Sequence, residues 1–258
     1  AVAEFCSTRP RLATADEAQR RRLPWAAVLT SDEVAASPQF AARGFDLAAP
    51  RVPWIITPGP PPDCGGCAGE SERSERPGDR AAKVSGAPAE DAVDAASVAG
   101  ERNIVIDLTW VLAGPFGTRI LADHGADVIK IESQHRPDPT RFAPIMHLGA
   151  GEPGHGETSG YFANHNRNKR SITLNLRTAE GQDVLRRLIA GADVVIDNFS
   201  AGTLQKWGLG PDQLWQLRDD LVIVEMSGTG QSGPWSRYVS YADAVSSLSG
   251  LTAATTDP

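Results

Sequence analysis

Cysteine is scarce in this sequence of 258 residues, and both a long apolar run and an excess of positive charge are missing. The three cysteines are few and odd in number, so a reducing, cytoplasmic setting without a disulfide scaffold is expected. Without an apolar run of about 18 residues, no membrane span is expected. A net charge of −7 argues against a nucleic-acid partner, because neutralising phosphates requires a basic surface.

Several catalytic and metal-binding patterns are missing as well. The sequence contains neither H-E-x-x-H nor a Ser-His-Asp pattern, and its five histidines are scattered. Cys64 and Cys67 form one C-x-x-C pair, but no second cysteine pair and no histidine pair at ligand spacing accompanies it. We therefore expect no metal site.

The amino-acid composition changes along the chain. Residues 1–49 carry a compact pattern, with a helix expected at 16–22, a strand at 24–29 and a helix that Ser31 opens as its cap. Residues 50–62 are rich in proline. Residues 63–102 hold almost no large apolar side chains, so we expect a flexible linker there. Residues 103–258 carry apolar runs again, and we expect them to fold.

In residues 103–258, runs typical of buried strands alternate with helical patterns. Strands are expected at 104–108, 126–131, 171–176, 193–196 and 221–226. Helices are expected from Pro115, from 178 to 190 with Thr178 as the cap, and at 213–218. The alternation predicts an α/β fold with a Rossmann-like, doubly wound and mostly parallel sheet.

Polar or glycine-rich motifs flank these strands, where ligands bind in parallel α/β sheets. The turn 112–117 opens a helix with Gly114 and Pro115 but lacks the G-x-G-x-x-G of dinucleotide sites, and a tight turn that needs glycine is the alternative. The run 166–170 offers amides and cations to a phosphate or carboxylate. A solvated charged loop is the alternative, and the run taken alone favours it.

Two further motifs follow later strands. In residues 197–202, Asn198 and Phe199 could hold a purine ring or a pantetheine amide, whereas a loop-closing Asn and a core Phe are the alternatives. Residues 227–234 form a glycine-rich loop whose backbone N–H groups could approach a ligand or a reacting carbonyl.

In this order and spacing, the motifs resemble the family III CoA-transferases, the group that includes formyl-CoA and carnitine CoA-transferases and the α-methylacyl-CoA racemases. The resemblance covers about residues 103–256. The residues that carry it are Ile104 to Leu108, Leu112 to Pro115, Leu121 to Asp123, Gly125 to Glu132, Asn166 to Ile172, Ala192 to Val195, Asn198, Phe199 and Ser227 to Pro234. It implies the large α/β domain of that family, present here incompletely.

Residues 20–62 resemble a different part of the same family, the segment near its C-terminus, through Leu23 to Leu29 and Ser37 to Phe45. We therefore expect a piece of a tandem protein, with the end of one copy in 1–62, a linker in 63–102 and the start of the next copy in 103–258. A circular permutation is the alternative. A chain that starts at Ala1 and stops at Pro258 fits the expectation of a fragment.

The resemblance implies transfer of CoA between an acyl-CoA and a carboxylic acid, with CoA as substrate and no separate cofactor. In such enzymes an Asp attacks the thioester, and an aspartyl-CoA thioester forms by way of a mixed anhydride. That Asp lies beyond the stretch that corresponds to Ser249 to Thr256, and Asp257 comes too early to take its role. No catalytic residue is therefore assigned, and the chain alone is expected to be inactive.

Residue-by-residue transfer from the family implies a CoA-binding set. Ala113 would contact CoA through its backbone, and Tyr241 would approach the acyl group. Asn198 and Phe199 would hold the adenine–pantetheine region. The residues that would face the phosphates or the rim of the pocket are Asn168, Lys169, Arg170, Arg177 and Lys206.

The sequence departs from the family at several of its positions. Ser133 replaces a frequent Arg, and Trp110 and Leu112 replace polar residues of the formyl-specific members, which suggests a larger or more apolar acyl group. Tyr241 stands where racemases place a His, so a transferase is favoured over a racemase. A non-catalytic CoA-binding or scaffolding module and a degenerate gene product are the alternatives. The implied assembly is a homodimer or a pairing of tandem domains in the full-length protein.

Overall fold

The computed structural model describes residues 2–44, 57, 59, 103–142 and 159–256. These residues form two compact units, which are treated separately below. Unit 1 comprises Ala1–Ile55, Asp197–Gly210 and Glu225–Pro258, and unit 2 comprises Ile56–Ile196 and Pro211–Val224. The predicted linker 63–102 lies outside the described residues.

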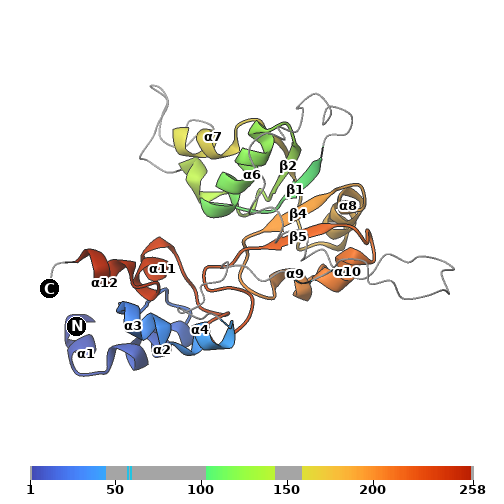
Figure 1. Cartoon of the computed structure of the whole chain (residues 1–258). Coiled ribbons are helices and arrows are strands. Elements are labelled where there is room, and N and C mark those ends of the chain that lie inside the picture. Colours follow the sequence, from blue (N-terminus) through green and yellow to red (C-terminus); the bar gives the residue numbers. More distant parts are fainter. Residues whose placement is uncertain (1, 45–56, 58, 60–102, 143–158, 257–258) are drawn as a thin grey trace, which may run out of the picture. The chain divides into compact units, whose positions relative to one another are not determined.

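A five-stranded sheet forms the centre of unit 2 (Figure 1). Its strand order is β3-β2-β1-β4-β5, and β1 pairs in parallel with both β2 and β4. The strands are β1 (Ile104–Asp107), β2 (Asp127–Glu132), β3 (Arg170–Thr173), β4 (Val194–Asp197) and β5 (Val222–Glu225). Because the strand order reverses between β1 and β4, the sheet is doubly wound, and the predicted α/β class is confirmed.

The central strands form because their branched apolar side chains are covered on both faces. Val105 and Val128 are each 1% exposed, and they lie opposite one another in the register of β1 and β2. Val195 of β4 is equally buried and is one pair further along β1, opposite Ile106.

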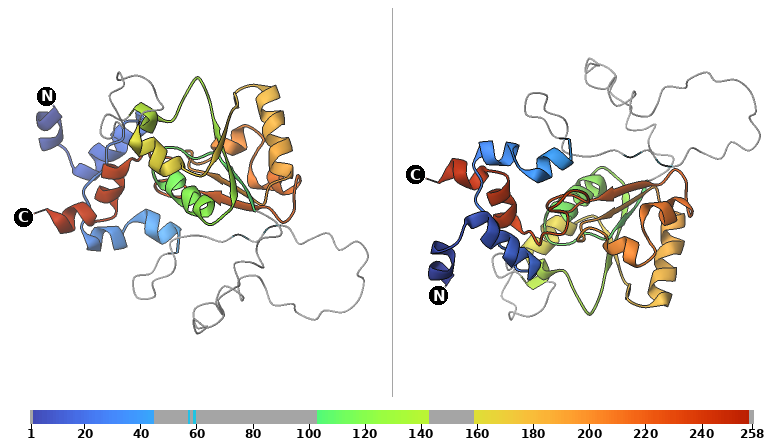
Figure 2. Two further views of the ribbon diagram at one scale, coloured as in Figure 1. Left: turned by 90° about the horizontal axis from the view of Figure 1, so that it is seen from above. Right: turned by 90° about the horizontal axis from the view of Figure 1, so that it is seen from below.

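Helices cover both faces of this sheet. Figure 2 shows α6 (Ala113–Asp123) and α7 (Gly160–Asn166) on one side of the strands, and α8 (Ala179–Ala190) and α10 (Pro211–Trp215) on the other. That is the arrangement that right-handed crossovers produce for this strand order. A short 3-10 helix, η2 (Pro139–Phe142), lies in the connection after β2.

The helix α8 begins as the sequence predicts. The hydroxyl of Thr178 accepts the N–H of Gly181 at 3.1 Å, which satisfies one of the free donors of the first turn. Leu185 and Ile189 lie one turn apart and are fully buried, as an amphipathic helix over a sheet requires.

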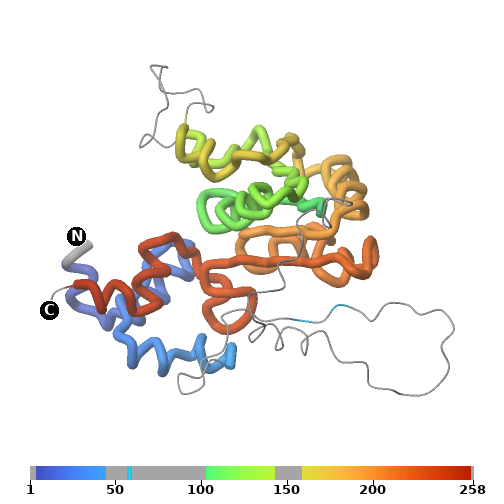
Figure 3. Tube along the Cα trace, turned by 45° about the horizontal axis from the view of Figure 1, so that its top comes forward, coloured from blue at the N-terminus to red at the C-terminus, as the bar shows by residue number. Residues whose placement is uncertain are grey.

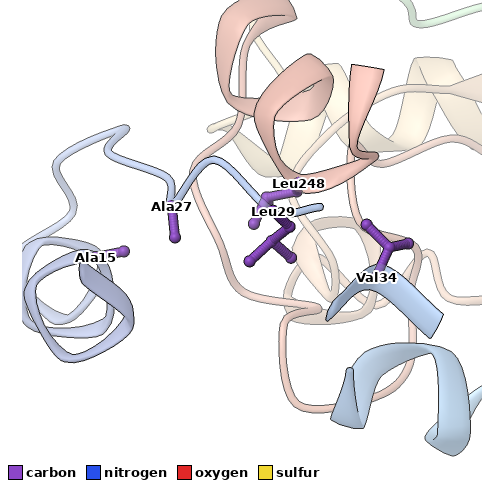
Figure 4. Close-up of a cluster of buried hydrophobic side chains, with 5 residues drawn as sticks. All are labelled: Ala15, Ala27, Leu29, Val34 and Leu248. Carbon is purple, nitrogen blue, oxygen red and sulfur yellow. The ribbon is translucent and has the colours of Figure 1, made fainter. Parts of the chain in front are cut away.

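Unit 1 brings together segments that lie far apart in the sequence. Figure 3 shows the N-terminal helices beside the last two helices of the chain. The helices are α1 (Val2–Ser7), α2 (Arg11–Arg20), α3 (Ser31–Ala35), α4 (Pro38–Ala42), α9 (Thr203–Lys206), α11 (Ala242–Leu248) and α12 (Leu251–Thr255). A buried apolar cluster joins the segments, formed by Ala15, Ala27, Leu29, Val34 and Leu248 (Figure 4).

The prediction of a strand at 24–29 is wrong. This stretch has no strand partner, and the N–H of Leu29 donates to the carbonyl of Ser247 at the end of α11. The apolar run reflects burial of Ala27 and Leu29 in the cluster instead. The cap of α3 is Thr30 rather than Ser31, and its hydroxyl forms a capping box with Glu33.

Other boundaries differ by a few residues. The helix α6 starts at Ala113, two residues before the predicted Pro115, and β3 ends at Thr173 rather than at 176. The helices α7, α11 and α12 were not predicted, since each is seven residues or shorter and carries little periodic signal. Within the described residues, no helix combines the length and the apolar character needed to cross a bilayer.

The close approach of α6 to the end of β1 depends on a glycine. A Cβ added at Gly114 would overlap the side chain of Thr109, whereas a Cβ at Gly117 in the same helix would meet nothing within 4 Å. We expect Gly114→Ala to lower the free energy of unfolding by about 2 kcal/mol through overpacking. Gly117→Ala should keep or raise it by up to about 1 kcal/mol, because alanine favours a helix. Urea titration of both variants measures this, and equal stabilities would contradict the described packing.

Candidate functional site

A buried ion pair lies at the carboxyl end of β1 in unit 2. The ammonium of Lys169 donates to the carboxylate of Asp107 at 3.0 Å, and the two side chains are 1% and 0% exposed. The same ammonium also donates to the carbonyl of Pro115 at 3.1 Å and to the side chain of Asn166 at 3.0 Å. All three donors of this lysine are therefore used.

The Asp107 carboxylate is equally well satisfied. Its Oδ2 accepts the hydroxyl of Thr118 at 2.7 Å, and its Oδ1 accepts the N–H and the hydroxyl of Thr109 at 2.9 and 2.5 Å. Burial by itself would raise the pKa of Asp107, but the ammonium groups of Lys130 and Lys169 and the two hydroxyls outweigh burial. The pKa of Asp107 thus lies below its usual range, and the group is an anion at neutral pH.

A second buried ion pair also forms hydrogen bonds to this turn. Lys130 lies within β2, is 2% exposed, and donates to the carbonyl of Thr109 at 2.8 Å. Its ammonium also lies 3.4 Å from the carboxylate of Asp138, which is 1% exposed and accepts the N–H of Val111 at 3.1 Å. The turn 108–115 is therefore held between two buried ion pairs.

This turn contains a strongly unfavourable backbone conformation, at Val111. Val111 has φ of +69°, a region that branched residues rarely adopt because the Cβ crowds the backbone. The bond from its N–H to Asp138 offsets that strain. Such conformations persist where the surroundings fix them, and they cluster at functional sites.

The turn presents the start of α6 at the carboxyl edge of the sheet. No side chain caps this helix end, and Ala113, its first residue, is exposed. The N-terminus of this 11-residue helix offers the N–H groups of Ala113 and Gly114, since Pro115 has none, and a partial positive charge. Such an end can accept a phosphate, a carboxylate or a polarised carbonyl.

The cations predicted to form an anion clamp are already paired in unit 2. Arg167 and Asn168 both donate to the carboxylate of Asp123, at 2.7 Å each, and Arg170 forms an ion pair with Asp127. Lys169 points inward to Asp107, unlike its exposed neighbours. The alternative of a simple solvated charged loop is therefore wrong for Lys169. The role of these residues toward phosphate stays a prediction.

A shallow hollow follows the ends of β2 and β3. It is lined by Ser133, Gln134, His135, Thr173, Leu174 and Asn175. Arg177 lies two residues beyond it, is exposed, and is held by a backbone bond to the side chain of Asn175 at 3.2 Å. Beside Ser133, the guanidinium of Arg136 lies 4.2 Å from the centre of the Trp110 ring. This part of the edge combines amide groups with exposed cations.

The other four predicted residues lie in unit 1. Phe199 contacts Trp207 edge to face, with ring centres 5.8 Å apart, and this places it next to α9 and its exposed Lys206. Asn198 is half-buried, and Tyr241 is 64% exposed at the start of α11. The site that the sequence predicts is thus divided between the units, with Ala113, Asn168, Lys169, Arg170 and Arg177 in unit 2.

Asp197 is a buried acid to which the sequence assigned no role. It is 3% exposed, its Oδ1 accepts the N–H of Phe199 at 2.9 Å, and its Oδ2 has no hydrogen-bond partner. Burial, opposed in part by that N–H bond and helped by the charge of Glu225, raises the pKa of Asp197 to about 7. Its position at the carboxyl end of a buried strand was the available signal.

The buried network also went unassigned at the sequence level. In the sequence, Asp107 and Lys130 stand out only as part of the family motif, and Thr118 and Asp138 belong to no motif. A lysine between isoleucines at the centre of a strand was the signal that could have identified Lys130. Among the residues that the structure describes, no cluster of three or more His, Cys, Asp or Glu could hold a metal ion. Cys64 and Cys67 lie outside those residues.

Comparisons with known proteins agree with this architecture. A model of CoA-transferase family III matches residues 102–258. An acyl-CoA transferase from Fusarium pseudograminearum is 43% identical over 148 residues, which is 57% of this chain and 32% of the relative. A succinate–glutarate CoA-transferase from Agrobacterium fabrum is 40% identical over 156 residues, which is 60% of this chain and 38% of the relative.

Solved structures of similar architecture are also found. The crystal structure of a CaiB/BaiF family protein from Brucella suis aligns with a TM-score of 0.52 and 38% sequence identity, covering 57% of this chain and 38% of that one. The chain spans about a third of the length of the curated relatives it matches.

Removing one member of the buried ion pair should lower the free energy of unfolding strongly. Lys169→Met leaves the Asp107 carboxylate buried without its cation, and we expect a loss of about 4 kcal/mol in the free energy of unfolding. Arg170→Met, at the neighbouring exposed ion pair, should change it little. Urea unfolding followed by far-UV circular dichroism compares the two variants. A similar small loss in both would show that the pair is not buried as described.

The protonation of Asp197 should appear in the pH dependence of stability. Because its folded pKa of about 7 exceeds the unfolded value of about 3.9, the stabilising contribution is full below pH 4 and is lost as pH rises toward 7. We expect unfolding free energy to fall by up to about 1 kcal/mol per pH unit between pH 4.5 and 6.5, and to level off above 7. Asp197→Asn should remove this component, and Asp220→Asn at an exposed site should keep it. An unchanged slope in Asp197→Asn would refute the assignment.

Proposed function

The chain belongs to CoA-transferase family III, and on this basis we propose that it supplies the CoA-binding part of an enzyme that transfers CoA between an acyl-CoA and a carboxylic acid. The observation that carries the proposal is the uncapped start of α6, fixed at the carboxyl edge of the sheet by two buried ion pairs. Family membership supports the type of reaction, and this geometry supports the place of binding.

The start of α6 suits the acyl-CoA thioester or an adjacent pantetheine carbonyl. The N–H groups of Ala113 and Gly114 can donate to an oxygen that gains negative charge when the thioester is attacked, whereas Pro115 has no N–H to contribute. Such donors are effective only if they are rigid, because reorganisation during the reaction costs part of the stabilisation. The bonds from Lys169 to the Pro115 carbonyl and from Thr118 to Asp107 supply that rigidity.

We assign the phosphates of CoA to the edge beyond β2 and β3. Exposed Arg177 and Arg136 flank the hollow lined by Ser133 and Asn175, and the combination of guanidinium and amide donors suits phosphate oxygens. Lys169 takes an indirect part, because its three donors are engaged inside the protein. Asn168 and Arg170 would reach a phosphate only in competition with Asp123 and Asp127.

The covalent chemistry proceeds through an Asp nucleophile in our proposal. Its carboxylate attacks the acyl-CoA carbonyl and expels CoA thiolate to give a mixed anhydride. The thiolate then attacks the aspartyl carbonyl, which releases the first carboxylate and leaves an aspartyl-CoA thioester. The acceptor acid repeats these steps in reverse. Since no residue of this chain is assigned as that Asp, we expect the chain to bind CoA without turnover.

The acyl group in this proposal is larger or more apolar than formate. Leu112 lies directly before the start of α6 and is 45% exposed, so it can contact an apolar chain next to the thioester. Trp110 on the same turn adds a large aromatic surface. Tyr241 remains the residue that we propose for the acyl side in unit 1.

Calorimetric titration of the purified chain with CoA tests the proposal. We expect binding, and we expect Arg177→Ala to weaken it about tenfold, since a charge-assisted bond to phosphate contributes about 1.5 kcal/mol. Arg187→Ala is the matched control, because Arg187 is an exposed arginine of α8 that forms an ion pair with Asp183 four residues away. Absence of binding at millimolar CoA, or an equal effect of both variants, would contradict the proposed site.

A further inference from the structure

A cavity of about 380 Å³ lies within unit 1. It is lined by one face of α2, by the run 24–26 and by one face of α11. Its volume falls in the range that small organic ligands occupy in proteins. None of the residues that line it belongs to the set proposed above to bind CoA, so the cavity is a separate candidate site.

The inner wall of this cavity is apolar. Ala15 of α2 and Ala244 of α11 are 7% and 5% exposed, and Pro24 and Ala26 continue the wall along the run 24–26. The half-buried ring of Trp25 adds an aromatic surface. Such a wall stabilises an apolar chain, because each methylene group that leaves water contributes favourably to binding.

The polar groups of the cavity offer free hydrogen-bond acceptors. The hydroxyl of Thr14 donates to the carbonyl of Pro10 at 3.0 Å, and the hydroxyl of Ser247 donates to the backbone carbonyl of Asp243 at 2.8 Å. Because each hydroxyl has used its proton, each oxygen retains only acceptor capacity. The carboxylate of Asp243 is exposed, and it has no hydrogen bond or ion pair with the residues that the structure describes.

The arginine at the rim of the cavity does not oppose this carboxylate. The guanidinium of Arg11 donates through Nη1 to the carbonyl of Val28 and forms an ion pair through Nη2 with Glu33. Its charge is therefore balanced, and two of its nitrogens are engaged. Of the charged side chains among the described lining residues, Asp243 is the one left without a partner.

We propose that this cavity binds a primary ammonium group carried at the end of an apolar chain. The three N–H donors of such a group match the acceptor oxygens of Asp243, Thr14 and Ser247. Its charge complements the unpaired carboxylate, and the face of the Trp25 ring also attracts a cation. A carboxylate or phosphate ligand would instead be repelled by Asp243.

NMR titration of the full chain with n-hexylammonium at neutral pH tests the proposal through the indole N–H signal of Trp25. The variant Trp25→Phe identifies that signal by its loss. We expect a saturable shift with a dissociation constant of about 1 mM. The alcohol 1-hexanol has the same chain without the charge, and it should bind about ten times more weakly because the charge-assisted hydrogen bond is lost.

The variant Asp243→Asn removes the charge that the proposal depends on, and it should weaken hexylammonium binding about tenfold. Asp212→Asn is the matched control and should leave binding unchanged. Both positions are exposed aspartates in the first turn of a short helix, but Asp212 lies in unit 2.

Three results would overturn the proposal. They are a Trp25 signal that does not shift at hexylammonium concentrations well above this dissociation constant, equal binding of 1-hexanol, and an equal effect of the two aspartate variants. CoA is absent from every arm of the experiment, so the outcome is independent of the site proposed for CoA.

Discussion

The arrangement at the carboxyl edge of the sheet depends on the contact between the Lys169 ammonium and the Asp107 carboxylate. Burying two charges is expensive, and it is tolerated here because the carboxylate accepts bonds from two threonines and the ammonium has two further oxygen acceptors. The pair joins the end of β1, the first turns of α6, the end of α7 and the start of β3. Those elements therefore cannot shift independently.

This constraint determines which groups the proposed site offers to a ligand. Arg167 and Arg170 are balanced by Asp123 and Asp127, so the described residues before β3 do not form an open cluster of positive charge. What it presents is a strained turn at Val111 and a helix start without a cap. Recognition of a CoA ester would then depend on fixed backbone donors in unit 2, with Arg177 and Arg136 contributing charge further along the edge.

Much of the fold followed from the sequence, because the strands 104–107 and 194–197 are nearly uniform in branched apolar residues and Thr178 marks a helix start. Whether an individual charged side chain is buried or exposed did not follow from the sequence. Lys169 and Arg170 are adjacent and chemically similar, yet one is buried and the other exposed, and only tertiary packing decides this. Likewise, the buried Gln39 gave no local signal, since the carbonyls to which its side chain donates lie about 190 residues away in the sequence. The run 24–29 misled the strand prediction because burial in an apolar cluster leaves the same pattern.

Hydrogen–deuterium exchange of the purified chain with and without CoA tests the central claim most directly. The account predicts that CoA slows exchange in the peptide covering residues 109–117, because the N–H groups at the start of α6 gain an acceptor. It also predicts that Lys169→Met, in solutions where it stays folded, exchanges faster there without CoA and loses the protection that CoA gives. Slowed exchange elsewhere in the chain, with residues 109–117 unaffected by CoA, would contradict the account.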